Sequence, residues 1–477
     1  MPIAAKPPNN QTTKPTTPMT IVIAIFILLA FILIAATPKT SVNKAALAVF
    51  AGTVGWVLYI CFGSDFVMAQ HSTDYMSFLR GATANSVAVK EYIASNIFIK
   101  YVGKASEIVL FLMSTMTIIE ILDSNGCFDF FPQWIKTRNS KRLLWSMAVL
   151  TFLLSANMDN LTVTTMMLVM MHKMLPNRRQ RAIFGPVIVL SANIGGALTV
   201  IGDPNGLLLW NMGAVTPSHF SAWMALPCLV AWTVPTYLMS RKLPERVDLE
   251  RVSLPYRGDD TRLTVWQRVA MFFFGIGGLW FIPTFRDITK LSPFVGALCV
   301  LALLSIVNEA FNHKLLVASR MTQRNASRTM HNGMLQMMLF IMGIMLMMGV
   351  LVETGASLWL GEFCLDTLGD TWSLCLAPLM ASVVSLALDS FATTAAFVSL
   401  HGIGGTAEFM TNGEYWILIA YATAVGGTIF GIGSLSGLAL FSMNTTTIGW
   451  YAKHFAPKML LGALLGLLVL IAEALYF

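Results

Sequence analysis

Charged side chains are scarce in this sequence. Only 12% of its 477 residues are Asp, Glu, Lys or Arg, whereas 56% are hydrophobic and the mean hydropathy is +0.68. A soluble domain carries about 25% charged residues. The composition therefore excludes a soluble globular protein and predicts a chain that crosses a lipid bilayer many times.

Cysteine is also sparse, and its spacing has no pattern. The six cysteines are scattered, and none forms a closely spaced set of the kind that binds zinc or carries redox chemistry. This absence excludes a cysteine-based metal site. We expect no cofactor.

The net charge of +7, from 31 basic and 24 acidic residues, could suggest an acidic partner such as nucleic acid. The basic residues gather instead in short loops between apolar segments, as cytoplasmic loops of membrane proteins do. The distribution indicates contact with the bilayer and no nucleic-acid partner.

Polar residues interrupt the apolar sequence in two similar blocks. The first covers residues 155–162 and 191–206, and the second, about 230 positions later, covers 385–394 and 424–437. The matching residues are Ser155 with Ser385, Asp159 with Asp389, Gly195-Gly196 with Gly426-Gly427, Gly202 with Gly433, and Gly206 with Gly437. Two copies of a unit with a polar centre at membrane depth are typical of secondary transporters.

The segment 143–174 is too long for one straight span. A helix of about 32 residues would extend about 48 Å, against a hydrocarbon core of about 30 Å. Basic residues flank both of its ends, so we predict a re-entrant hairpin that opens to the cytoplasm. The matching segment 373–400 has acidic residues but no Lys or Arg on either side, which predicts a hairpin opening outward.

The predicted fold is an all-α polytopic membrane protein with two inverted-topology repeats. Each repeat has about five spanning helices and one re-entrant hairpin, with unwound helices at a central site. The predicted parts are a disordered tail at 1–19, a first repeat at 20–240 with hairpin 143–174 and broken helix 182–206, a cytoplasmic basic linker at 241–268, and a second repeat at 269–477 with hairpin 373–400 and broken helix 416–437.

Ten crossings with both termini outside fit this arrangement. The expected spans are 21–36, 45–62, 108–122, 182–202, 222–239, 269–283, 294–307, 334–352, 416–433 and 459–475. We expect residues 63–104 to form a long mixed loop. Arg286 and Lys290, in a short loop placed outside, depart from the charge rule.

Asp159 and Asp389 are the candidate ion- and proton-binding carboxylates. An acid at the centre of a spanning helix costs roughly 2.5–3.5 kcal/mol to insert, so a functional role is the default interpretation. A structural acid bonded to the neighbouring hairpin is the alternative. Neutral oxygens suited to a hard cation come from Ser155, Asn157, Asn160, Thr162, Ser385, Ser390 and Thr393.

Further candidates lie at the expected helix breaks and span ends. Asp203 is a third acid near membrane depth, with an interfacial turn as its alternative role. Glu120 and Glu353 are possible relay groups or ordinary interfacial acids. Unwound backbone is expected at Gly195, Gly196, Gly202, Gly426, Gly427 and Gly433, although such glycines also serve close helix packing.

The chain resembles the ion transporter superfamily, and most closely its NhaD-type sodium/proton antiporters. The resemblance lies in the run Ser155–Thr162, in Asn193–Gly196 with Ile201–Asp203, and in Met116–Glu120, within about 100–445. It implies exchange of Na⁺ or Li⁺ for H⁺, Na⁺ binding near Asp159 and Asp389, and a multi-pass location in a bacterial inner membrane. Ion-binding roles implied by the matching motifs fall on Asp159, Asn160, Asp203, Ser385 and Asp389, and Asn193 is a further candidate ion-binding residue.

Two departures and two alternatives accompany this resemblance. Ser390 stands where such antiporters usually have Asn, and Pro204 follows Asp203. A sodium-coupled carboxylate transporter of the same superfamily is the nearest rival, but acids at both tips with no accompanying Lys or Arg argue against an anion site. An intramembrane aspartyl protease lacks its expected motifs here, so no enzyme is predicted. A homodimer is left open.

Overall fold

The computed structural model describes residues 18–40, 42–80, 83–128, 135, 137–247, 263–316, 325–369, 371–443 and 446–476. Within these ranges every regular element is a helix. The all-α polytopic prediction is confirmed. Nearly all of the predicted tail and residues 248–262 of the predicted linker lie outside the described residues.

Nine of the described helical segments are long and apolar enough to cross a membrane. They are Pro18–Thr37, Lys44–Cys61, Ser86–Ser124, Pro217–Ser240, Val265–Thr289, Pro293–Phe311, Met334–Glu353, Glu414–Ser442 and Ala456–Ala474. The tenth expected span, 182–202, falls in α10 (Arg178–Ala197), which is not among them. Helix α10 is buried along most of its length, so its neighbours are protein and its side chains can be more polar.

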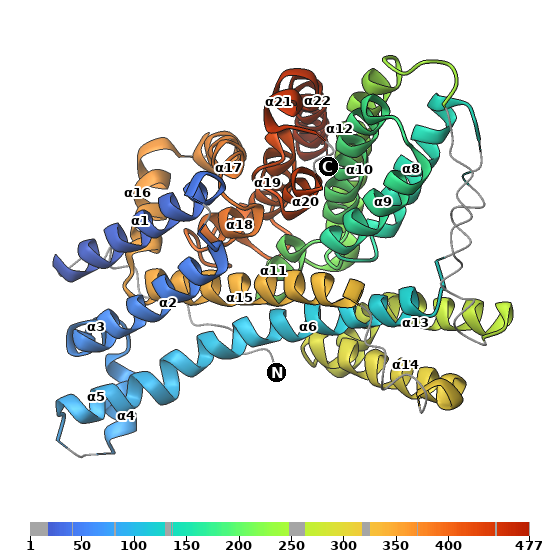
Figure 1. Cartoon of the computed structure of the whole chain (residues 1–477). Helices are drawn as coiled ribbons and strands as arrows, with labels where there is room; N and C mark the ends of the chain where they lie inside the picture. The colour runs from blue at the N-terminus through green and yellow to red at the C-terminus, as the bar shows by residue number, and fades with distance from the viewer. Residues whose placement is uncertain are drawn as a thin grey trace.

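The helices form two groups (Figure 1). One group runs along one side of the molecule and contains α2 (Lys44–Cys61), α6 (Ile99–Ser124), α13 (Val265–Thr289), α14 (Pro293–Leu316) and α15 (Asn325–Glu353). The other contains α8 to α12 and α17 to α22. Helices α1 (Pro18–Thr40) and α16 (Ala356–Leu368) lie at one end of the molecule.

Helices α2 and α15 hold the first group together through a close approach. A Cβ on Gly343 would lie 2.5 Å from the backbone of Ala48, and a Cβ on Gly52 would lie 2.9 Å from Leu346 Cβ. Small residues at such a seam let two helix backbones pack closely in a membrane. The indole of Trp56 adds a hydrogen bond of 3.1 Å to the carbonyl of Leu346.

Each predicted hairpin is a pair of helices separated by a short break. Helix α8 (Ser140–Ser155) is followed by α9 (Asn160–Met174). In the second half, η4 (Trp372–Leu376) and α17 (Ala377–Ser385) precede α18 (Ser390–Val398). Both breaks therefore end at an aspartate that begins the next helix.

Two further helices are interrupted next to these pairs. Helix α10 stops at Ala197 and α11 (Pro204–Met212) begins after Asp203. Helix α19 (Glu414–Phe430) stops before Gly431, and α20 (Leu435–Ser442) begins after Ser434. Helices α12 (Pro217–Ser240), α21 (Ile448–His454) and α22 (Ala456–Tyr476) complete the second group.

The same local contacts join the interrupted helices in both halves. The hydroxyl of Ser155 donates to the carbonyl of Ala192 at 2.6 Å, and that of Ser385 donates to the carbonyl of Thr423 at 2.8 Å. A Cβ on Gly195 would lie 2.4 Å from the Phe152 carbonyl oxygen. Serine and glycine therefore hold each helix pair against the adjacent broken helix.

The prediction of a loop over residues 63–104 is wrong. This stretch contains α3 (Gly63–Gln70), α4 (Ser72–Leu79), α5 (Ser86–Tyr92) and the π-helix η1 (Ile93–Phe98), which leads directly into α6. Buried aromatic and aliphatic side chains, including Tyr75 and Ile93, alternate with exposed polar ones. A mixed composition here reflects amphipathic helices.

We predict that Gly195→Ala destabilises the fold because the new methyl group would overlap the Phe152 carbonyl. The expected loss is about 1–3 kcal/mol, the usual cost of overpacking. Thermal unfolding of the purified protein in detergent measures it. Gly103→Ala is the matched control, since a Cβ at Gly103 meets nothing within 4 Å. Equal unfolding temperatures for both variants would contradict the described packing.

Candidate functional site

Asp159 begins helix α9 and leaves one carboxylate oxygen unused. Its Oδ2 accepts from the Thr162 backbone N–H at 2.9 Å and from the Thr162 hydroxyl at 3.1 Å. Its Oδ1 is buried and has no hydrogen-bond partner within the described part of the chain. A buried acceptor without a donor costs stability, and it is a place where a cation or proton can bind.

Asp389 begins helix α18 in the same way, but both of its oxygens have partners. Its Oδ1 accepts from the Phe391 backbone N–H at 3.1 Å, and its Oδ2 lies 2.7 Å from Lys44 Nζ. The sequence argument that neither tip has a lysine beside it is wrong for this tip. Helix α2 supplies the ammonium group, 345 positions away in the chain.

Asp203 is the third acid of the group. It begins helix α11, and its carboxylate accepts weakly from Asn205, at 3.4 Å from the backbone N–H and 3.3 Å from the side-chain amide. It lies close enough to Asp159 and Asp389 for their charges to interact. At the corresponding place in the second half, Ser434 caps α20 through Gly437 N–H at 3.1 Å.

A cavity of about 20 Å³ lies between these helix starts. A buried space needs roughly 10–15 Å³ of probe-occupied volume to hold one water, so it is large enough for a single small ion. Its lining consists of Asn160, Asp203, Pro204, Met337, Phe340, Ile341, Asp389, Ser390, Phe391, Ser434 and Leu435. Among the predicted residues, four reach the cavity: Asn160, Asp203, Asp389 and Ser390.

Several predicted residues lie beside the cavity and use their polar groups in the fold. The hydroxyls of Ser155 and Ser385 donate to backbone carbonyls, and Thr393 donates to the Asp389 carbonyl at 3.0 Å. Asn193 donates to the Thr428 hydroxyl at 3.0 Å, while its own Oδ1 is buried without a donor in the described chain.

Asn157 lies apart from this group. Its Oδ1 accepts a short hydrogen bond from the indole of Trp280 on α13, and its amide donates to the Leu153 carbonyl at 2.8 Å. The structure therefore places Asn157 between the first helix pair and α13. It does not place Asn157 beside the three aspartates.

Predicted glycines bring the broken helices into contact with their own turns. A Cβ on Gly196 would lie 2.9 Å from the Gly202 carbonyl oxygen, and a Cβ on Gly427 would lie 2.9 Å from that of Gly433. The backbone turns after α10 and α19 are thus tightly folded. The helix starts at Asp203 and Ser434 follow directly from them.

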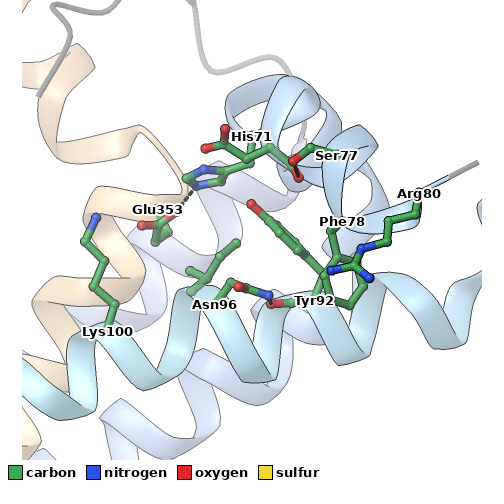
Figure 2. A pocket seen from close by; sticks show the side chains of 10 residues that line it. His71, Ser77, Phe78, Arg80, Tyr92, Asn96, Lys100 and Glu353 are labelled. Carbon is green, nitrogen blue, oxygen red and sulfur yellow. Dashed lines mark hydrogen bonds and ion pairs between the residues drawn. The ribbon is translucent and has the colours of Figure 1, made fainter.

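Glu353 lies in a different, larger pocket of about 680 Å³. Figure 2 shows His71 and Glu353 side by side in its wall, joined by a dashed line. The His71 ring nitrogen is 2.7 Å from Glu353 Oε2, and the Tyr101 hydroxyl donates to Oε1 at 2.7 Å. Glu353 is 13 positions along α15 from Phe340, a rise of about 20 Å in a helix, so it is outside the central cavity.

Glu120 lies on α6 and is partly buried. Neither Glu120 nor Glu353 lines the central cavity. No three His, Cys, Asp or Glu side chains in the described ranges gather closely enough to hold a metal. The central cavity is therefore lined by two carboxylates, Asp203 and Asp389, and by neutral oxygens that can contact an ion.

Lys44, Phe340 and Ser434 are among the residues of the site that the sequence analysis did not single out. Lys44 and Phe340 give no local signal, because their contacts come from helices distant in the chain. Ser434 could have been found, since it stands at the repeat position of Asp203.

The fold and the buried polar centre define a polytopic membrane transporter, and comparison with known proteins agrees. Residues 12–426 match the family described as citrate transporter, CitMHS. The chain belongs to this family, which lies within the ion transporter superfamily. It is a multi-pass membrane transporter and not an enzyme.

The chain is also similar to proteins named as antiporters. It is 30% identical to sodium/proton antiporter 1 of Arabidopsis thaliana over 78% of this chain and 62% of that protein, so the match spans less than two thirds of that relative. For sodium/proton antiporter 2 of the same plant the identity is 29%, covering 78% and 86%. For the Na⁺/H⁺ antiporter NhaD of Vibrio parahaemolyticus it is 24%, covering 70% and 82%.

We predict that Glu353→Gln lowers stability more than it lowers transport. The substitution removes the charge that faces His71, and a hydrogen bond to a charged group contributes about 1.5–3 kcal/mol. Thermal unfolding and transport are measured side by side, with Glu362→Gln, an exposed acid on α16, as control. Lost transport at unchanged stability would instead assign Glu353 the relay role considered from the sequence.

Proposed function

We propose that the protein exchanges Na⁺, or Li⁺, for H⁺ across the membrane by alternating access. The cation and the proton compete for the buried carboxylates Asp159, Asp203 and Asp389. The antiporter names of its relatives support the exchange of a cation for a proton. The observation that carries the proposal is the unpartnered Asp159 Oδ1, buried beside a cavity that Asp203 and Asp389 line.

A bare carboxylate in this environment is costly. The effective penalty for burying one ion in a protein is several kcal/mol, and either a proton or a sodium ion on the oxygen removes much of it. The site can therefore change from facing one side of the membrane to facing the other with one ligand bound, and change back with the other ligand bound. In both directions its carboxylates are neutralised. This competition is the simplest way to couple the two fluxes.

Charge favours a cation over an organic anion as cargo. Helix N-termini attract anions, but here Asp159, Asp203 and Asp389 already occupy three such termini. Lys44 offsets one of these charges. A carboxylate substrate would meet a surplus of acid. The citrate transporter description of the family keeps sodium-coupled carboxylate transport as the second candidate.

The proposed mechanism uses two inverted repeats with five spans and one hairpin each. The recurring Ser155 and Ser385 contacts support the repeat. We infer that the group containing the helix pairs moves against the group containing α2, α13 and α15. If more protons than sodium ions move, the membrane potential contributes about 2.3 kcal/mol per net charge per 100 mV.

A bacterial inner membrane is the proposed location, on the strength of the NhaD-named bacterial relatives. Both termini outside and a cytoplasmic basic linker at 241–268 belong to the same proposal. Assembly as a homodimer stays a prediction.

We predict that Asp159→Asn and Asp389→Asn each lower sodium-driven proton movement at least about tenfold, equivalent to 1.4 kcal/mol or more. An amide cannot take up a proton or neutralise a cation at the site. A pH-sensitive dye in everted vesicles reports the movement after NaCl, LiCl, KCl or citrate is added.

Asp366→Asn, at an exposed acid on α16, is the matched control and should respond like the wild type. Absence of a response to every cation, together with sodium-dependent citrate uptake, would replace the proposal with the second candidate.

A further inference from the structure

The ion pair between Lys44 and Asp389 connects the two groups of helices. Lys44 is the first residue of α2, and Asp389 is the cap of α18. Their charged atoms are 2.7 Å apart, and the two side chains are 19% and 6% exposed. The contact therefore lies in a largely water-excluded place, where a charge without a partner is costly.

The position of Lys44 is fixed by the packing of its helix. The close seam of Gly52 and Gly343 sets α2 against α15. At the start of α2 the Lys44 ammonium lies 4.7 Å from the centre of the Phe340 ring, a cation–π contact. Phe340 also lines the central cavity. The ammonium thus lies at the cavity wall.

Lys44 forms its ion pair with the one carboxylate oxygen of Asp389 that accepts no hydrogen bond from the first turn of α18. Oδ1 is used by Phe391 N–H, and Oδ2 by Lys44. At the equivalent Asp159, the helix start also uses one oxygen, but the other accepts no hydrogen bond from the residues that the structure describes. A cation that binds Asp389 through Oδ2 must displace the ammonium, whereas one that binds Asp159 displaces nothing.

We propose that Lys44 is a tethered competitor of the transported cation at Asp389, and that cation binding there releases the second helix pair from α2. The inference rests on the proposed function of the same site and assigns a specificity and coupling role to a residue outside the repeat motifs. While the site is empty, Lys44 neutralises Asp389 and holds the two helix groups together.

The contact at the first helix pair provides an internal comparison. There Asn157 binds Trp280 on α13 through a neutral hydrogen bond. A cation that binds elsewhere in the site displaces no charged group from that contact, since neither partner is charged. The Lys44–Asp389 contact is therefore the one of the two in which a bound cation would replace a cationic side chain.

Binding of radioactive ²²Na⁺ to the purified protein tests the competition. Removing the ammonium in Lys44→Met should lower the apparent Kd for Na⁺ by up to about fivefold, the upper end of the range given by an ion pair of ordinary strength. Lys44→Arg keeps a cation and should retain an affinity close to wild type. Lys90→Met, at an exposed lysine of α5, is the charge-matched control.

Hydrogen–deuterium exchange gives a second readout, beginning with the wild type. Adding NaCl to the wild type should raise exchange over residues 42–47 and 386–393, and leave residues 153–158 unchanged. In Lys44→Met, exchange over 386–393 should already be high and should not rise further.

An unchanged or weaker Na⁺ affinity in Lys44→Met, with Na⁺ bound normally by the wild type, overturns this inference alone. So does an NaCl response that is absent at 386–393 in the wild type. If the wild type binds neither Na⁺ nor Li⁺, the proposed function fails as well, and the two failures are thereby distinguished.

Discussion

The structure depends on the cost of an ionised carboxylate away from water. Each of the three central aspartates begins a helix, where backbone N–H groups of the first turn can donate hydrogen bonds to its carboxylate. These helix starts exist only because the chain is interrupted in the middle of the molecule. The breaks, and the contacts that hold them, follow from that requirement.

Small residues make the breaks possible. Ser155 and Ser385 bond to the neighbouring broken helices, and Gly195 and Gly426 remove the side chains that would keep the helices apart. The aspartates are consequently held by rigid helix starts around a space for one small ion. The contacts of Ser155, Ser385, Gly195 and Gly426 do not involve the aspartate side chains, so they can stay in place when the ligand changes.

The polar blocks could be predicted from the sequence because lipid makes every polar residue conspicuous. The predicted tip at residues 155–162 contains the observed break between Ser155 and Asn160. The same contrast between polar and apolar residues led to the wrong prediction of a loop at 63–104. The amphipathic helices there contain as many polar residues as a loop would. The expected span 182–202 falls in α10, which is buried in protein and is not among the candidate spans of the described chain.

The remaining features of the site could not be predicted, because they depend on packing between distant segments. Nothing near Lys44 in the sequence indicates that α2 packs on α15 at the level of Phe340, or that its ammonium reaches Asp389. Asn157 belongs to a polar motif, yet its neighbour is Trp280 and not an aspartate. Repeat matching locates residues within each half, and it cannot locate contacts between unmatched helices.

The central claim is that a cation and a proton compete for one set of buried carboxylates. The most direct measurement is the apparent Kd for Na⁺ of the purified protein as a function of pH, in detergent and without a gradient. Competition predicts that the affinity falls as the pH is lowered, approaching about tenfold per pH unit for one proton displaced per ion. An affinity for Na⁺ that is constant across the pH range would contradict the account.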